Sequence, residues 1–463
     1  MTAGVMRATK ARPFAQEVAT LFLLALPLIL GQLFGMGTDV ILSIIGGHMG
    51  ADVMASVALG SSLWIVVFMA VLGMMMSVQP AISILHGAGR EHEAGHVFAQ
   101  ALILGLAIGI LGGLLLAFAG PLVATQMDLP RAVRPGVTAF LRGAAFSIPG
   151  LGLLACCRGL SEGLSMTRPT MAVGGFGLVC LVPVAWVLME GVTLPWFGRV
   201  GGFGPLGAGL AIAFVLLAEA GFYLLWIRAS GRYPMVEWSA PAFRLDTVAI
   251  GHLMRVGAPI AVAVVMEVCM FSVATLMVGH FGAVAVAGHQ VALMTSAVFF
   301  MVPLGLSLAV TVRVGRAVGA RDKAGIRRAG CAGFAVMFCT QSVSACCMLL
   351  VPREIAGVFT DVPAVATLGA SLLTLAGLFQ FADGTQVIAM AALRGLQDTR
   401  VPMVLAMLSY WLVGIPLGAV FAFFAHLGVR GVWFGLMGGL TLAALMLTTR
   451  FFLASAAGLK RSP

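Results

Sequence analysis

The sequence has 463 residues, of which 60% are hydrophobic and 10% are charged, and its mean hydropathy is +1.06. A soluble chain would carry about 25% charged residues, so a soluble enzyme or nucleic-acid-binding domain is excluded despite the net charge of +10. The eight cysteines lie in or beside apolar segments without the spacing of metal ligands, which indicates neither zinc sites nor disulfides.

Apolar, charge-poor segments follow one another along the chain, and each is long enough to cross a hydrocarbon core of about 30 Å. We predict twelve spanning helices at residues 18–43, 53–79, 96–119, 136–157, 169–191, 205–227, 250–278, 286–312, 328–351, 363–392, 401–425 and 431–454. The first segment has no obvious cleavage site and is interpreted as a spanning helix rather than a signal peptide. The sequence therefore predicts an all-α integral membrane protein without a soluble domain.

The lysines and arginines are distributed unevenly between the two sides of this predicted bundle. Of the 27, 21 lie in the termini, the even-numbered connections or the adjoining helix ends, and only 6 lie on the opposite side. Cytoplasmic connections of membrane proteins carry an excess of lysine and arginine. Both termini are therefore predicted to be cytoplasmic.

The second half of the chain repeats polar landmarks of the first half, in the same order and at a near-constant offset. The aligned pairs are Pro27 with Pro259, GHMG (47–50) with GHFG (279–282), GAGR (87–90) with GARD (319–322), and RGLSE (158–162) with RGLQD (394–398). Six helices in each half make the halves parallel repeats, related by a pseudo-two-fold axis along the membrane normal.

This repeat predicts an N-lobe at residues 1–230, a cytoplasmic inter-lobe loop at 231–249 and a C-lobe at 250–463. Duplicated membrane proteins include transporters, channels and intramembrane enzymes. Transporters of this kind hold their substrate and ion sites near the midplane, whereas an intramembrane enzyme needs a nucleophile–base or metal constellation, and we find none in the sequence. No Walker motif is present, which argues against ATP-driven export.

Three carboxylates lie inside predicted helices. Glu267 lies midway between Arg255 and His280, which places it near mid-depth in a helix that rises by the same amount at every residue. Asp383 and Asp39 lie further from the centre of their helices. An ionised acid at such depth costs roughly 2.5–3.5 kcal/mol on insertion scales, so each is predicted to face the bundle interior or a water-filled cavity.

These acids have a structural and a functional interpretation. A protonated acid can hydrogen-bond a neighbouring helix and serve only as structure. A carboxyl group can instead bind a proton or a sodium ion reversibly and couple it to transport. In the repeat alignment Glu267 falls opposite Gly35 and Asp383 opposite Ser147, so neither acid is required by the shared scaffold. This asymmetry favours ion coupling in the second half.

Several long segments of the sequence resemble a known family. Residues 255–319, with Glu267 ahead of GHQVAL, and residues 379–403, beginning FQFADGTQVIAMAALRG, are similar to the multidrug and toxic compound extrusion family in its NorM-like bacterial branch. SYWLVGIPLG (409–418) and HGAGR (86–90) extend the similarity over essentially the whole chain.

The resemblance implies a twelve-helix, two-lobed antiporter of the bacterial inner membrane. Such a protein exports cationic amphipathic compounds by alternating access in exchange for Na⁺ or H⁺, without enzymatic activity or an organic cofactor. Glu267 and Asp383 match the family's cation-coupling acids, and both are metal ligands if the coupling ion is sodium. Asp39 lies three residues before the position of the family's helix-one aspartate and is a third coupling candidate.

The substrate cavity is expected to involve Gln290, Phe271, Phe379 and Gln386, for which helix packing is the alternative role. Many relatives have tyrosine where this chain has Phe379, which leaves proton coupling open beside sodium coupling. Pro27 and Pro259 occupy matching positions and are candidate hinges. We expect a monomer that contacts the lipid bilayer and small organic cations but no nucleic acid. A flippase for lipid-linked precursors or polysaccharides is the alternative function, although its substrate requires a more cationic cavity.

Overall fold

The computed structural model describes residues 13–126, 130, 132–194, 198–239 and 243–457. In the first half of the chain the helices are α1 (Phe14–His48), α2 (Ala51–Met75), α3 (Val78–Gly87), α4 (Glu91–Gln126), α5 (Arg134–Ala145), α6 (Ser147–Gly163), α7 (Arg168–Met189) and α8 (Pro205–Ala229). An antiparallel hairpin of β1 (Val192–Leu194) and β2 (Gly198–Val200) connects α7 to α8, with Thr193 opposite Arg199.

Every element that the structure describes in the second half is a helix. Its elements are α9 (Thr247–Gly279), α10 (Ala283–Gly319), α11 (Lys323–Leu350), α12 (Pro352–Phe359), α13 (Pro363–Gly395), α14 (Arg400–Met407), the π-helix η2 (Leu408–Gly414), α15 (Ile415–Ala419), the π-helix η3 (Val420–Phe424) and α16 (Val429–Ala457).

Twelve segments of the described chain are long and apolar enough to cross a membrane, which confirms the number of predicted spanning helices. Three segments combine shorter elements: α2 with α3, α5 with α6, and α14 through η3. Several helices extend past the predicted ends. α10, for example, continues to Gly319 through Arg313 and Arg316, because a helix can leave the apolar layer and keep its backbone hydrogen bonds in water.

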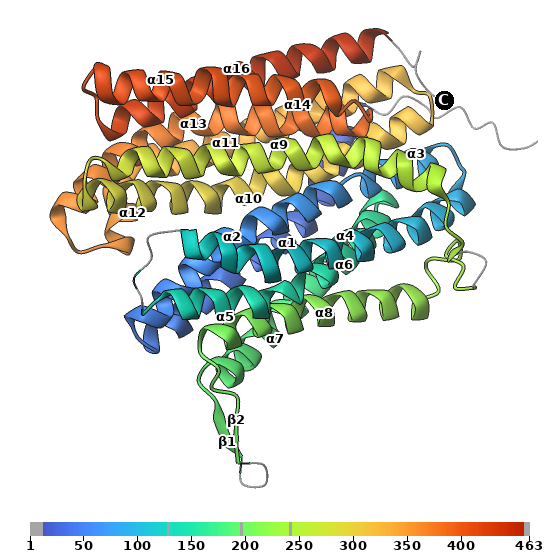
Figure 1. The fold of residues 1–463 in the computed structure, drawn as a ribbon. Helices are drawn as coiled ribbons and strands as arrows, with labels where there is room; N and C mark the ends of the chain where they lie inside the picture. The colour runs from blue at the N-terminus through green and yellow to red at the C-terminus, as the bar shows by residue number, and fades with distance from the viewer. Residues whose placement is uncertain (1–12, 127–129, 131, 195–197, 240–242, 458–463) are drawn as a thin grey trace, which may run out of the picture.

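The helices form two bundles, with the first half in blue to green and the second in yellow to red (Figure 1). The halves exchange contacts symmetrically, because α1 packs on α10 while α9, its repeat counterpart, packs on α2. Leu21, Ala25 and Leu28 of α1 belong to the same buried cluster as the core of the second half. The two halves are thus joined through the first two spanning helices of each.

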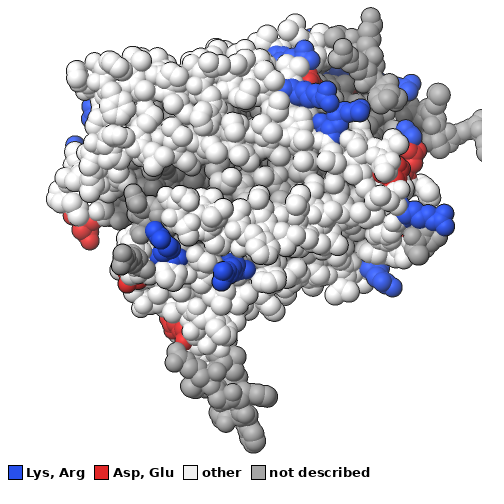
Figure 2. Space-filling model, in the orientation of Figure 1, with Lys and Arg blue, Asp and Glu red and all other residues white. Residues whose placement is uncertain are grey.

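The halves approach each other closely at the basic end, which carries the connections at 88–90 and 320–322. A Cβ on Gly319 of α10 would overlap the carbonyl oxygen of Ile84, and a Cβ on Gly87 of α3 would overlap that of Arg316. At the same end, Arg313 donates two hydrogen bonds of 2.7 Å to the carboxylate of Glu17, across the two halves. In Figure 2 the surface is instead hollowed between the halves toward the end that carries α12.

The connection between the halves is tied to α4. Gln100 donates from Nε2 to the carbonyl oxygen of Arg244 (2.8 Å) and accepts from the backbone N–H of Asp246 at Oε1 (2.9 Å). Asp246 caps α9, and hydrogen bonds from His96 and from the first backbone N–H groups of α9 hold the pKa of its carboxyl below its usual range. The start of α9 is therefore fixed to the first half.

Replacing Gly319 by alanine is expected to lower the melting temperature of the detergent-solubilised protein. The added methyl group would have to displace the α3 backbone, and overpacking of this kind costs about 1–3 kcal/mol. Thermal unfolding followed by tryptophan fluorescence measures the change.

Gly251→Ala is the matched control, because nothing lies within 4 Å of a Cβ at that helical position. Alanine is favoured over glycine in a helix by about 1 kcal/mol, so this variant should equal or exceed the parent. A Gly319→Ala protein as stable as Gly251→Ala would contradict the close contact between α3 and α10.

Candidate cation-coupling site

A chain of hydrogen bonds joins three spanning segments of the second half around Glu267. Tyr410 of η2 donates from its hydroxyl to Gln386 Oε1 (3.0 Å), and Gln386 Nε2 donates to Glu267 Oε1 (3.2 Å). Gln386 is 1% exposed and Tyr410 is fully buried. The tyrosine proton fixes which end of the amide faces Glu267, so the carboxyl group of α9 is held by an oriented donor from α13.

Asp383 lies three residues before Gln386 on α13, so their side chains occupy neighbouring places on one helix face. It is only 5% exposed, and its Oδ1 has no hydrogen-bond partner among the described residues. Arg394 is on the same face of α13, but the intervening turns of helix separate the two by about 16 Å. Asp383 is therefore a buried acid whose nearest cation on its own helix is too far along the helix to pair with it.

Asp383 differs from its counterpart in the first half, Ser147, in having no hydrogen-bond partner for one oxygen. In the first half, Trp64 donates from Nε1 to the hydroxyl of Ser147, at 3.0 Å. The repeat alignment places Ser296 opposite Trp64 and Asp383 opposite Ser147. Ser296 Oγ, like Asp383 Oδ1, is buried without a partner in the described structure. At the positions where the first half has a tryptophan–serine hydrogen bond, the second half thus has two buried oxygens without partners. Buried polar groups usually have a hydrogen-bond partner, so a bound partner is expected here.

Aromatic rings lie along α9 and α13 on the side of these acids away from the basic end. Phe271, one turn after Glu267, meets Phe379 edge-on with ring centroids 6.4 Å apart. Phe379 in turn packs against Trp433 of α16, at 5.9 Å. Aromatic faces attract organic cations, so this row of rings is chemically suited to the predicted substrate.

His289 of α10 connects the same aromatic row to α9. Trp433 Nε1 donates to His289 Nδ1 (3.1 Å), so the ring proton of the neutral imidazole is assigned to Nε2. Nε2 then donates to Thr275 Oγ1 (3.1 Å), and Thr275 donates to the carbonyl oxygen of Phe271 (3.0 Å). His289 is fully buried, and every polar atom of this chain of contacts is paired.

The structure brings together Glu267, Gln386, Phe271 and Phe379 by direct contacts, with Asp383 on the same face of α13. Gln290 is exposed, while its neighbour His289 is the buried member of GHQVAL. The side chain of Asp39 lies outside the described residues. Pro27 and Pro259 lie within the unbroken helices α1 and α9, and their role as hinges stays a prediction.

Sequence reasoning missed His289, Ser296, Tyr410 and Trp433. The only signal for the first was its place beside a polar residue in an apolar run, and a single helical step separates a buried from an exposed position. Ser296 could have been found by aligning it with Trp64 in the repeat. The tyrosine and tryptophan carry no charge, so hydropathy does not distinguish them from packing residues.

This donor set suits a proton or a hard monovalent cation. The carboxylates of Glu267 and Asp383 offer oxygen ligands, which hard cations prefer over nitrogen or sulfur ligands. A proton on either acid would also satisfy an unpaired carboxylate oxygen. Because the site lies in the bundle interior, occupation by a cation neutralises charge that is otherwise costly there.

The family model described as MatE matches residues 27–187 and 259–420. The chain belongs to the MatE family. The two matched segments begin at Pro27 and Pro259, which are the prolines that the internal repeat aligns. The protein is accordingly a membrane transporter of the MatE family and not an enzyme, as the sequence resemblance predicts.

Relatives and solved structures agree over nearly the full length. The chain is 41% identical to a probable multidrug resistance protein NorM of Xanthomonas axonopodis pv. citri, covering 95% of this chain and 94% of the relative. It is 37% identical to multidrug resistance protein PmpM of Pseudomonas aeruginosa, covering 94% and 91%.

Among solved structures, an outward-facing multidrug resistance MATE family transporter has a TM-score of 0.86 at 18% identity, covering 98% of this chain and 100% of that one. The eukaryotic MATE transporter AtDTX14 has a TM-score of 0.84 at 19% identity, covering 96% and 99%. These structures confirm the predicted all-α, twelve-helix, two-lobed fold.

Replacing His289 by alanine is expected to destabilise the second half. The change leaves Trp433 Nε1 and the Thr275 hydroxyl without their partner, and an unsatisfied buried group costs about 1–3 kcal/mol. The loss is measured as a lower melting temperature in detergent.

Gln290→Ala is the adjacent control, since an exposed side chain away from special contacts changes stability by about 0.5 kcal/mol or less. Equal destabilisation by the two variants would show that the His289 contacts do not hold α9, α10 and α16 together.

Proposed function

We propose that the protein is a multidrug efflux antiporter, which exports cationic amphipathic compounds in exchange for H⁺ or Na⁺. Three observations support this function: membership of the MatE family, relatives named as multidrug resistance proteins, and the oxygen cluster of Glu267 and Asp383 beside aromatic rings. The site of action is a bacterial inner membrane, with both chain termini in the cytoplasm.

The buried acid Asp383 with its unpaired oxygen is the observation that carries the proposal. Such a group is costly in the bundle interior unless a cation or proton occupies it. If the coupling cation and the organic cation neutralise the same acids, they bind exclusively. Cation binding from the outside then releases the drug, and drug binding from the inside releases the cation.

The conformational step is proposed to move the lobes 1–230 and 250–463 about the inter-lobe loop 231–249. The structure is closed at the basic end and hollowed at the other, so with a cytoplasmic basic end it corresponds to an outward-facing state. Opening to the cytoplasm requires the glycine contact of α3 with α10 and the Glu17–Arg313 pair to separate.

Glu267→Gln and Asp383→Asn are each expected to reduce cation-driven efflux by about tenfold or more, within the range of ordinary coupling free energies. The amides keep the shape of the acids but neither bind a proton at this site nor neutralise a cation. The measurement is efflux of a fluorescent organic cation from proteoliposomes, with proton and sodium gradients imposed separately.

Glu354→Gln, at an exposed acid of α12, is the control and should transport like the parent. Unchanged gradient-driven efflux in both site variants would refute the assignment of the coupling site. Absence of dye efflux by the parent under either gradient would refute drug antiport itself.

Ser296→Ala is expected to weaken coupling-cation affinity by about two- to tenfold, the worth of one hydrogen bond, without lowering the melting temperature. The hydroxyl has no partner in the described structure, so its removal costs the empty protein nothing. Ser307→Ala on the same helix removes a hydroxyl that bonds the carbonyl oxygen of Leu304 (2.7 Å) and serves as a comparison for stability alone.

Cation affinity is read from the half-saturating proton or sodium concentration of efflux. Loss of stability in Ser296→Ala with unchanged cation affinity would assign the hydroxyl to structure.

A further inference from the structure

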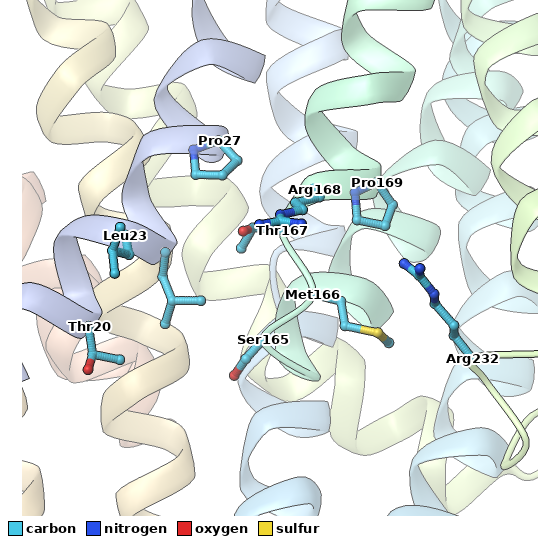
Figure 3. Close-up of a pocket in the computed structure, with 10 residues that line it drawn as sticks. Thr20, Leu23, Pro27, Ser165, Met166, Thr167, Arg168, Pro169 and Arg232 are labelled. Carbon is cyan, nitrogen blue, oxygen red and sulfur yellow. The ribbon is translucent and has the colours of Figure 1, made fainter. Parts of the chain in front are cut away.

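A cavity lies outside the cation-coupling site, near the basic end of the first half. It measures about 410 Å³ and is bounded by α1, by the connection between α6 and α7, and by the inter-lobe loop (Figure 3). Its described lining is Thr20, Leu23, Leu24, Pro27, Ser165, Met166, Thr167, Arg168, Pro169 and Arg232. The cavity is therefore lined by two arginines, three hydroxyl groups and apolar side chains, without a described acidic residue.

The two arginines provide positive charge that nothing in the described structure neutralises. Arg168 begins α7 and Arg232 reaches from the inter-lobe loop toward Pro169, as Figure 3 shows. Both are exposed, and neither forms an ion pair with a described residue. Positive guanidinium groups in fixed positions recognise phosphate oxygens through paired N–H donors.

The backbone adds further donors for an anion. The long helix α7 begins at this cavity, and the side chain of its N-cap residue, Thr167, does not cap it. The N-terminal end of a helix presents free N–H groups and a partial positive charge. Ser165, two residues before Thr167, holds a positive φ of 64°, and its hydroxyl oxygen is buried without a partner in the described structure. The cavity is thus lined by two guanidinium groups, a serine and the start of a helix.

The remaining wall is apolar and continuous with the outer surface of α1. Leu23 lines the cavity yet is 69% exposed, and its neighbours Phe22 and Leu26 are also exposed. On a spanning helix such residues face lipid chains. A free inorganic anion would contact only the polar part of this cavity, whereas a phospholipid matches both parts.

We propose that this cavity binds the headgroup of an anionic glycerophospholipid from the cytoplasmic leaflet, with an acyl chain along Leu23 and its neighbours on α1. The phosphate is held by Arg168 and Arg232. Basic pockets between helices on the cytoplasmic side are a recurrent form of lipid headgroup site. Because α1 packs on both halves, the lipid contacts a helix that must move in transport.

The test is native mass spectrometry of the detergent-purified full chain with dioleoylphosphatidylglycerol, dioleoylphosphatidylcholine and inorganic phosphate. Phosphatidylglycerol should bind at least tenfold more tightly than phosphatidylcholine, and millimolar phosphate should not displace it. The double variant Arg168→Gln/Arg232→Gln should lose about thirtyfold in phosphatidylglycerol affinity, since two near-surface arginines each contribute about 1 kcal/mol.

Two further variants make the outcome specific. Arg168→Lys/Arg232→Lys keeps the charge and should retain most of the affinity. Arg244→Gln/Arg255→Gln removes two exposed arginines outside the cavity, on the same side, and should bind like the parent. Equal retention of both lipids, displacement by phosphate, or the same loss in the Arg244/Arg255 variant would each overturn the proposal.

Discussion

A carboxylate inside an apolar helical bundle must find hydrogen-bond donors, a counter-charge or a bound cation, and this requirement organises the second half of the molecule. Glu267 has a donor in Gln386, whose orientation is set by Tyr410. Asp383 keeps one oxygen without a partner in the described structure. The Trp433–His289–Thr275 contacts are fully paired, whereas Ser296 Oγ and two nitrogens of Arg394 are, like Asp383 Oδ1, buried without a partner in the described structure. A coupling cation bound at Asp383 would neutralise the carboxylate and provide a partner for its unpaired oxygen.

The internal repeat explains how such a site arises without disturbing the fold. Both halves use the same crossing of their first two helices, and both halves place a glycine at the close contact between α3 and α10. They differ where the first half pairs Trp64 with Ser147 and the second half has Ser296 and Asp383. A hydrogen-bonded pair in the first lobe thus corresponds to two polar side chains with unpaired oxygens in the second. We infer that the helix packing shared by the two halves permits the conformational change, and that the residues that differ between the halves form the ion site.

Much of this fold could be predicted from the sequence because membrane insertion imposes simple rules. The twelve spans follow from hydropathy, and the repeat follows from ordered polar landmarks in apolar sequence. Glu267 and Asp383 were evident because charge is rare at such depth. The β1–β2 hairpin, the π-helices η2 and η3, and His289 were not predicted. Hydrogen-bond register and the direction of one side chain depend on tertiary packing, which composition does not record.

If a coupling cation and an organic cation neutralise Glu267 and Asp383 in turn, the two cations compete for the same site. Calorimetric binding of tetraphenylphosphonium to the purified protein, at several pH values and sodium concentrations, tests it directly. We expect binding to weaken as protons or sodium ions are added, and this dependence to disappear in the Glu267→Gln/Asp383→Asn double variant. Binding to the parent that is independent of both cations, or an equal dependence in the double variant, would contradict it.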